Sequence, residues 1–175
     1  MIHDVRGCAI EGALAMRPAI LAHVVNDVGA FGRGFAGSIA RRWPEVARGY
    51  KGWRTRGFTE GPEGTRDYVP FLLGNIMFSK GAEALWVAHL LAQQGLPSRT
   101  NLLPLNMNAL TVCLRRLAEE TNGLSGVHGG APYTVHMPRI GCGLARGDWA
   151  EVRALVESAF GSADAPDCTI YTLEG

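Results

Sequence analysis

Apolar and polar positions along the chain alternate in blocks that predict strands separated by helices. Short apolar runs rich in β-branched residues predict buried strands. The strand candidates are residues 2–6, 19–25, 75–79, 84–91, 133–138 and 168–173. The first of them, residues 2–6, has only a weak alternation of apolar and polar positions. Lys80-Gly81 joins the two middle candidates and predicts a tight connection. The pattern indicates an α/β domain with a largely parallel or mixed sheet.

Helices are predicted between these strands. Leu110, Leu114 and Leu117 recur at three- and four-residue spacing, which predicts a helix over residues 106–121 with one buried face. Two further helices are predicted over residues 38–43, ended or restarted by Pro44, and over residues 148–160. Polar, glycine-containing stretches at residues 52–70, 95–104 and 123–130 predict loops. No internal repeat or long linker divides the chain, so we expect a single domain over residues 1–175.

The composition is that of a globular protein without a bias towards a charged partner. Hydrophobic residues make up 47% and charged residues 19% of the chain, and the formal net charge is +1. This balance gives no electrostatic case for a nucleic-acid or anionic-membrane partner. No apolar run reaches the roughly 18 residues that a membrane span needs. The N-terminus also lacks the order of a signal peptide, so we expect a cytoplasmic protein.

The cysteines and histidines do not predict a metal or redox site. The four cysteines are far apart and form no Cys-x-x-Cys pair. The five histidines are scattered, without a helical metal spacing. We therefore expect no metal ion and no cofactor. His23 and His136 lie inside strand patterns and are expected to be core residues.

Glycine is the compositional outlier, with 23 residues where average usage of about 7% predicts roughly 12. Several of these glycines fall in residues 26–35 and 141–147, two segments that each join a predicted strand to a predicted helix. Glycine lets backbone N–H groups approach a ligand without a Cβ, and a helix N-terminus adds donors and a positive dipole end. Ligands of open α/β sheets bind beyond the carboxyl ends of the strands. The two segments together therefore predict a clamp for a diphosphate.

The first segment also matches a dinucleotide-binding pattern. Gly32-Arg-Gly34-Phe-Ala-Gly37 fits G-x-G-x-x-G. Such a site needs a second strand that ends in Asp or Glu about 20 residues further on, whereas Glu60 and Asp67 lie in the polar stretch. A dinucleotide-dependent oxidoreductase is therefore the third of our hypotheses. A P-loop is excluded because the chain has no Gly-Lys-Ser/Thr.

Two strings resemble the ligand loops of macro domains. They are AHVVNDVGAFGRGF at residues 22–35 and MPRIGCGLARGDW at residues 137–149. The resemblance is closest to the branch with the terminal ADP-ribose protein glycohydrolase and ADP-ribose-1″-phosphate-processing-like proteins, and it covers nearly the whole chain. It implies a three-layer α/β/α fold with a mixed central sheet and an ADP-ribose cleft at the strand ends.

The resemblance assigns roles to residues of both segments. Asn26 would contact the distal ribose, Phe31 and Phe35 would pack on the ligand, and Arg146 would contact a phosphate or be solvated. Asp148 has two interpretations, as a general base for water or as a helix N-cap with Glu151 at the third helical position. The other expected ligand-binding residues are Cys8, Ala9, Gly29, Gly32, Gly34, Gly141, Cys142, Gly143 and Leu144.

The chain lacks residues that macro domains of this branch use to bind adenine and to catalyse hydrolysis. Cys8 stands where macro domains usually carry an Asp that accepts from the adenine amino group, and a thiol is a weak acceptor. That loss costs about 1.5–3 kcal/mol, or roughly ten- to a hundredfold in affinity, unless the base of the ligand is not adenine. Ala145 replaces the catalytic Asp of the glycohydrolase branch and residues 92–94 lack its Lys. The covalent Lys/Asp mechanism is therefore excluded.

Two hypotheses lead. The first is an enzyme that hydrolyses an ADP-ribosyl ester or ADP-ribose-1″-phosphate, a mono-ADP-ribosyl hydrolase or a phosphatase. In it the ligand's own phosphates orient the water, and Asn26 and Asp148 are the catalytic candidates. The alternative is a non-catalytic module that binds ADP-ribose or a nucleotide derivative. In both cases the partner is ADP-ribose or a related nucleotide diphosphate, free or carried by an ADP-ribosylated protein.

Overall fold

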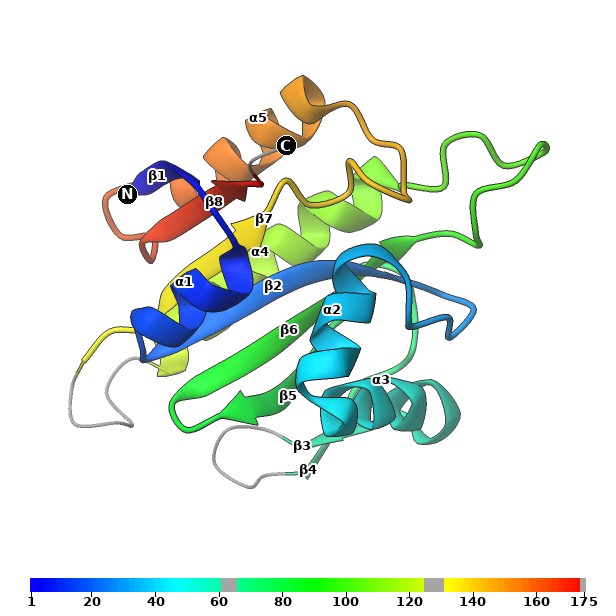
Figure 1. Cartoon of the computed structure of the whole chain (residues 1–175), viewed down its shortest axis with the longest axis horizontal. Coiled ribbons are helices and arrows are strands. Elements are labelled where there is room, and N and C mark those ends of the chain that lie inside the picture. Colours follow the sequence, from blue (N-terminus) through cyan, green and yellow to red (C-terminus); the bar gives the residue numbers. More distant parts are fainter. Residues whose placement is uncertain (61–65, 125–130, 174–175) are drawn as a thin grey trace.

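The predicted strands and helices appear in the expected order. The structure adds a helix before the second strand, and a helix and a short strand pair after the predicted helix at residues 38–43. The computed structural model describes residues 1–60, 66–124 and 131–173. Within these ranges the elements are β1 (Ile2–Arg6), α1 (Ala9–Ala15), β2 (Ala19–Asn26), α2 (Gly34–Arg42), α3 (Pro44–Arg56), β3 (Phe58–Glu60), β4 (Arg66–Tyr68), β5 (Ile76–Ala82), β6 (Leu85–Gln93), α4 (Met107–Leu124), β7 (Thr134–Pro138), α5 (Trp149–Phe160) and β8 (Cys168–Thr172) (Figure 1).

Six of the described strands form one mixed sheet, in the order β1-β8-β7-β2-β6-β5. Neighbouring strands run parallel except for the edge strand β5, which is antiparallel to β6. The strands β3 and β4 form a separate antiparallel pair. Because β1, β2, β6, β7 and β8 are mutually parallel, their carboxyl ends lie at the same edge of the sheet. Both glycine-rich segments leave the sheet at this edge.

Helices cover both faces of the sheet. Successive residues of a strand point to opposite faces, so Ile20 and Ala22 of β2 pack in a core with α4 and α5, whereas Ala19 and Leu21 pack in a second core with α1 and α2. In Figure 1, α1, α2 and α3 lie in front of the sheet and α4 lies behind it. The expected three-layer α/β/α architecture with a mixed central sheet is confirmed.

Helix α1 is an element that the sequence pattern did not predict, because Gly12 interrupts its apolar face. Gly12 packs against Tyr171 of β8. A Cβ at this position would lie 2.1 Å from the Tyr171 hydroxyl oxygen. The residue that weakens the helical pattern is therefore the one that lets the helix lie against the sheet.

The expected loop at residues 52–70 is wrong in part, because α3 and the β3–β4 pair occupy much of it. Val46, Tyr50 and Trp53 are fully buried on one face of α3. Their four- and three-residue spacing is helical, but Gly49 and Gly52 lie among them and hide the pattern. Residues 61–65 of this expected loop, and residues 125–130 of the expected loop at 123–130, lie outside the described residues.

The connection between β5 and β6 also differs from the prediction. The turn falls at Glu83 and Ala84 rather than at Lys80-Gly81, and Ala84 has a φ of 53°. Gly81 lies instead inside β5, where the register shifts between Lys80 and Ala82. A Cβ on Gly81 would lie 2.6 Å from Leu85 Cδ2, so this glycine is required by cross-strand packing and not by a turn.

Candidate functional site

A cavity of about 1390 Å³ lies at the carboxyl edge of the sheet. Its walls come from the ends of β2 and β8, from residues 30–36 and from residues 138–145. Gln93, at the end of β6, and the adjacent Leu96 and Pro97 form another side. The volume exceeds the roughly 300–1,000 Å³ of common small-molecule pockets, which leaves room for a ligand of dinucleotide size. We call residues 26–35 the first loop and residues 139–147 the second loop.

Asn26 holds the first loop in shape. Its Nδ2 donates to the main-chain oxygen of Ala30 at 2.7 Å. Its Oδ1 accepts from the main-chain N–H groups of Ala30 at 3.0 Å and Val28 at 3.2 Å. The Tyr50 hydroxyl donates to the main-chain oxygen of Asn26. Asn26 lines the cavity, and its side chain fixes the turn after β2. This structural role is additional to the contact with the distal ribose that the resemblance implies.

The first loop leads into the N-terminus of α2 at the cavity wall. The first N–H groups of a helix have no partner within the helix, and Gly34, Phe35 and Ala36 of this first turn line the cavity. Gly34 has a φ of 55°, in the left-handed region that favours glycine. A Cβ on Gly37 would lie 2.6 Å from the Gly32 carbonyl oxygen. The helix therefore packs directly on the loop and presents its N–H groups to the cavity.

This packing accounts for the G-x-G-x-x-G match without a dinucleotide site. A Rossmann sheet has the strand order 3-2-1-4-5-6. The order here is β1-β8-β7-β2-β6-β5, with one antiparallel edge strand. The glycines serve the turn and the close contact between helix and loop, in a sheet of different topology.

The second loop folds back on itself and packs on Leu105. The Gly147 N–H donates to the Gly141 carbonyl oxygen at 2.8 Å. A Cβ on Gly141 would lie 2.9 Å, and one on Gly147 2.3 Å, from Leu105 Cδ2. Gly143 differs from these two, because nothing lies within 4 Å of its Cβ position. Since Gly143 also lines the cavity, the backbone there is uncovered.

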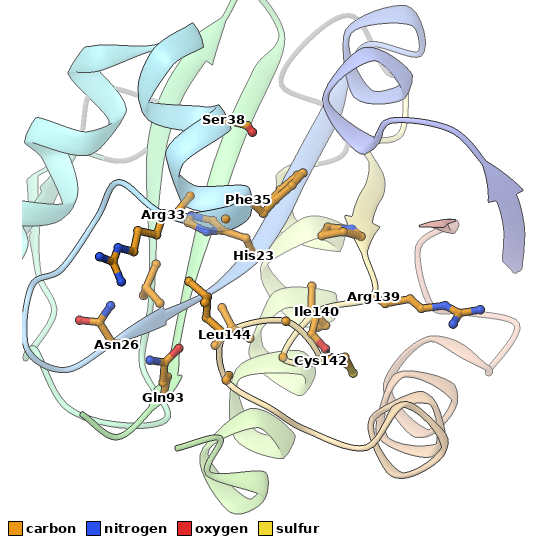
Figure 2. A pocket seen from close by; sticks show the side chains of 18 of the residues that line it. His23, Asn26, Arg33, Phe35, Ser38, Gln93, Arg139, Ile140, Cys142 and Leu144 are labelled. Atoms are coloured by element: carbon orange, nitrogen blue, oxygen red, sulfur yellow. Dashed lines mark hydrogen bonds between the residues drawn. The ribbon is translucent and has the colours of Figure 1, made fainter. Parts of the chain in front are cut away.

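The two loops meet through Leu144. This side chain is 48% exposed, and its Cδ1 lies 3.5 Å from the position that a Cβ on Gly34 would take. Figure 2 shows Leu144 between Asn26 and Gln93 on one side and Ile140 and Cys142 on the other. The loops therefore face each other across the cavity, at a distance that one leucine side chain spans.

The charge of the lining favours an anion. The charged side chains among its described residues are Arg33 and Arg139, and none of those residues is an Asp, Glu or Lys. The Arg139 guanidinium lies 5.4 Å from the centre of the Trp149 ring, and Figure 2 shows its side chain pointing away from Ile140, Cys142 and Leu144. The positive charge of the lining and the N-terminus of α2 suit a phosphate or diphosphate, and Arg33, the residue before α2, is the arginine next to that helix terminus.

Asp148 caps α5. Its Oδ1 accepts from the N–H groups of Ala150 at 2.8 Å and Glu151 at 3.2 Å, so the capping interpretation is confirmed. Asp148 is not among the lining residues, and neither is Arg146, whose Nη1 donates to the Leu102 carbonyl oxygen at 3.5 Å. A catalytic role for Asp148 and a phosphate contact for Arg146 stay predictions.

Cys142 lines the cavity as a protonated thiol. Burial raises the pKa of this thiol, and the Asp148 carboxylate adds to the shift. Its Sγ donates to the Ile140 carbonyl oxygen at 3.3 Å. A thiol that is hard to deprotonate is a poor nucleophile, so Cys142 is a packing residue of the second loop.

The predicted ligand residues divide into two groups. Cys8 is the N-cap of α1, Ala9 is the buried first residue of that helix, and Gly29 packs beside Arg54. All three lie outside the cavity lining. The adenine contact expected at Cys8 and Ala9 therefore stays a prediction. The predicted residues that line the cavity are Asn26, Phe31, Gly32, Gly34, Phe35, Gly141, Cys142, Gly143 and Leu144.

Several lining residues were missed from sequence. Arg33 lies within the first loop, and Gln93 and Arg139 lie at the carboxyl ends of β6 and β7. Their position at strand ends was a signal that we did not use. His23 gave a weaker signal, because it lies inside an apolar run and nothing in its neighbours marks it as a site residue.

Neither a metal centre nor a membrane segment is found in the described ranges. Residues 1–60, 66–124 and 131–173 contain no group of three His, Cys, Asp or Glu side chains that could hold a metal ion. Over the same residues, no helix has the length and apolar character to cross a bilayer.

Comparisons with known proteins find likeness among solved structures. No protein-family model matches the sequence, and no curated protein matches it. A macrodomain protein from Streptomyces coelicolor is 29% identical, with 100% of each chain covered and a TM-score of 0.72. The macrodomain of Mycobacterium tuberculosis DarG is 21% identical, with 98% of this chain and 97% of that chain covered and a TM-score of 0.72. An Oceanobacillus iheyensis macrodomain with ADP is 15% identical, with 98% and 82% covered and a TM-score of 0.65.

Proposed function

Because the chain has the macrodomain fold, we propose that it binds ADP-ribose or a closely related nucleotide diphosphate between the first and second loops. The proposed domain comprises residues 1–175. The observation that carries the proposal is the charge of the lining, in which Arg33 and Arg139 are accompanied by no carboxylate among the described residues. A diphosphate between the two loops would accept hydrogen bonds from the N–H groups at the start of α2.

The apolar part of the lining supports a nucleotide rather than a free phosphate. Phe31 and Phe35 of the first loop line the cavity, and aromatic rings pack on the apolar faces of sugars and bases. The Oceanobacillus iheyensis macrodomain carries ADP, which is the diphosphate part of the ligand proposed here.

Hydrolysis is the second candidate function. Water would add across the bond between the distal ribose and its acyl or phosphoryl group, releasing ADP-ribose and the free acid. Since no Asp, Glu or Lys belongs to the described lining, the ligand's own phosphate would orient the water in place of a protein base. The open space at Gly32 favours this reaction, because it leaves room for a water molecule beside the diphosphate.

Calorimetric titration with ADP-ribose tests the binding proposal. We expect micromolar affinity for the wild-type protein and a roughly two- to tenfold loss in Arg33→Gln, which removes a charged donor from the lining. Arg48→Gln is the matched control, because Arg48 is an exposed arginine of α3 outside the lining. No heat of binding at two temperatures, with either ADP-ribose or ADP, would refute the proposal.

Turnover is tested separately with an ester-linked ADP-ribosylated protein and with ADP-ribose-1″-phosphate. Substrate-assisted hydrolysis predicts that Asn26→Ala abolishes turnover, because the first loop loses its shape, while Asp148→Asn leaves it intact. Tight binding without turnover of either substrate would make the protein a non-catalytic module.

A further inference from the structure

A chain of hydrogen bonds runs from the cavity into the core across three neighbouring strands. His23 of β2 lines the cavity, and its Nε2 lies 2.8 Å from Nδ1 of His89 on β6. Nε2 of His89 lies 3.1 Å from Oγ of Ser79 on β5. The Ser79 hydroxyl in turn lies 3.4 Å from the sulfur of Met77. None of these residues has a part in the proposed function above.

Each histidine contact of this chain allows either atom to donate, depending on the tautomer. A thioether sulfur only accepts, which favours the arrangement in which the Ser79 hydroxyl donates to Met77 and its oxygen accepts from Nε2–H of His89. A neutral imidazole carries one proton. Nδ1 of His89 is therefore an acceptor, which takes the Nε2–H of His23. His23 is left with an unprotonated Nδ1.

Both histidines are neutral at physiological pH, so they can donate and accept hydrogen bonds but do not act as proton-accepting bases. Burial lowers the pKa of His23 to about 3 and takes the pKa of His89 well below its usual value. Phe31 packs against both rings, with centroid distances of 5.5 Å to His23 and 5.7 Å to His89. A group with so low a pKa takes up no proton from water at neutral pH. Its fixed orientation does suit it to accept a hydrogen bond.

Nδ1 of His23 has no hydrogen-bond partner in the described part of the chain. The side chain as a whole is 2% exposed and lines the cavity. Nδ1 is not one of the fully enclosed unpaired atoms of the described residues, so this nitrogen is accessible from the cavity. His23 lies at the cavity beside the segment that carries Arg33 and Phe35 (Figure 2). A hydroxyl group of a ligand in the cavity can therefore reach this nitrogen as a donor.

We propose that His23 recognises a hydroxyl group of the bound ligand, which donates to Nδ1, and that His89 and Ser79 are positioning residues that keep His23 in the Nε2–H form. The inference rests on the proposed function, because the ribose hydroxyls are the donors that ADP-ribose brings beside its diphosphate. The contact with His23 would let the site recognise the sugar of the ligand, in addition to its diphosphate.

Calorimetry with ADP-ribose and with ADP tests the proposal on the wild type, His23→Leu and Ser79→Ala. Loss of one neutral hydrogen bond predicts a roughly three- to tenfold weaker Kd in both variants. An effect on ADP-ribose alone assigns the hydroxyl to the distal ribose, and an effect on both ligands assigns it to the adenine-side ribose. His136→Leu is the matched control. This histidine is also fully buried and bonded to two side chains, but it does not line the cavity, so the Kd should change less than twofold.

A spectroscopic measurement tests the positioning role even if His23→Leu fails to fold. Long-range ¹H–¹⁵N correlation spectra show which ring nitrogen carries the proton. We expect Nε2–H on both histidines in the wild type and a loss of this preference at His89 in Ser79→Ala. A proton on Nδ1 of His23, or unchanged affinity in both variants, overturns the proposal. A wild-type protein that binds neither ligand refutes the proposed function instead, and hydroxyl recognition with it.

Discussion

The substitution Gly143→Ala should weaken ligand binding without lowering the stability of the fold. The Cβ position of Gly143 has nothing within 4 Å, and its φ lies outside the left-handed region. Alanine fits this backbone, so the free energy of unfolding should stay unchanged or rise by about 0.4–1 kcal/mol, through the entropy of the unfolded chain. The added methyl group would nevertheless lie in the cavity, against the proposed diphosphate.

The expected loss of affinity follows from the cost of one extra methyl in a fitted contact. Overpacking of this kind costs about 1–3 kcal/mol, and 1.4 kcal/mol is tenfold in Kd. Gly143→Ala should therefore weaken ADP-ribose binding by roughly fivefold to more than a hundredfold, as measured by calorimetry, while urea unfolding shows wild-type stability. Gly123→Ala is the control, because Gly123 has equally open space but lies in α4, outside the lining. Equal affinity of Gly143→Ala and the wild type would refute our placement of the diphosphate against the second loop.

Three further predictions concern stability and its link to the site. Asp148→Ala removes the acceptor for two N–H groups of α5, so it should lower stability by about 1 kcal/mol in thermal denaturation while ADP-ribose affinity stays within twofold; a large loss of affinity would contradict the cavity lining. Cys8→Asp should stabilise α1 by about 0.5–1 kcal/mol, because Cys8 is an N-cap without a side-chain hydrogen bond. A tenfold gain in ADP-ribose affinity in the same variant would place adenine at this residue. Stability should also fall as the pH drops below about 6.5, by roughly 1.4 kcal/mol per pH unit for each buried histidine. Burial lowers the pKa of His23 to about 3 and that of His136 to about 4, so the unfolded chain takes up protons first; a flat urea-unfolding profile from pH 7.5 to 5 would contradict this.

The sequence predicted those features in which a residue pattern has a single common structural cause. The runs that became β2 and β6 are buried on both faces, so their apolar character is continuous and easily recognised. Asp148 followed by Glu151 has the spacing of a helix start. The glycines of the two loops also pointed to the cavity, because glycine is favoured where the backbone turns sharply or approaches a partner closely.

Sequence reasoning failed where glycine has a different use. Gly12 in α1 and Gly49 and Gly52 in α3 lie within helices, yet a glycine inside an apolar pattern lowers the prediction of a helix. The need that Gly12 meets, space for the Tyr171 ring, arises from a strand more than 150 residues further along the chain. No local pattern contains that information.

The hydrogen-bond chain from the cavity was out of reach for a similar reason. His23 pairs with His89 in the register of β2 and β6, and Met77 pairs with His89 in the register of β5 and β6. A shift by one residue in either pairing would turn one partner to the opposite face of the sheet. Strand order and register had to be known before these side chains could be placed together.

The contact between Leu144 and Gly34 bears on how long a ligand stays bound. In the proposed complex the Leu144 side chain lies over the space between the two loops, and a ligand passes it when the side chain rotates. Rotamer changes of exposed side chains take picoseconds to nanoseconds, so this rotation does not slow capture, which orientation of the two molecules already limits. Departure requires the ligand to lose its contacts with both loops while Leu144 is turned away. Loss of the Leu144 contact, as in Leu144→Ala, should therefore shorten the residence time of the ligand and leave its rate of capture almost unchanged.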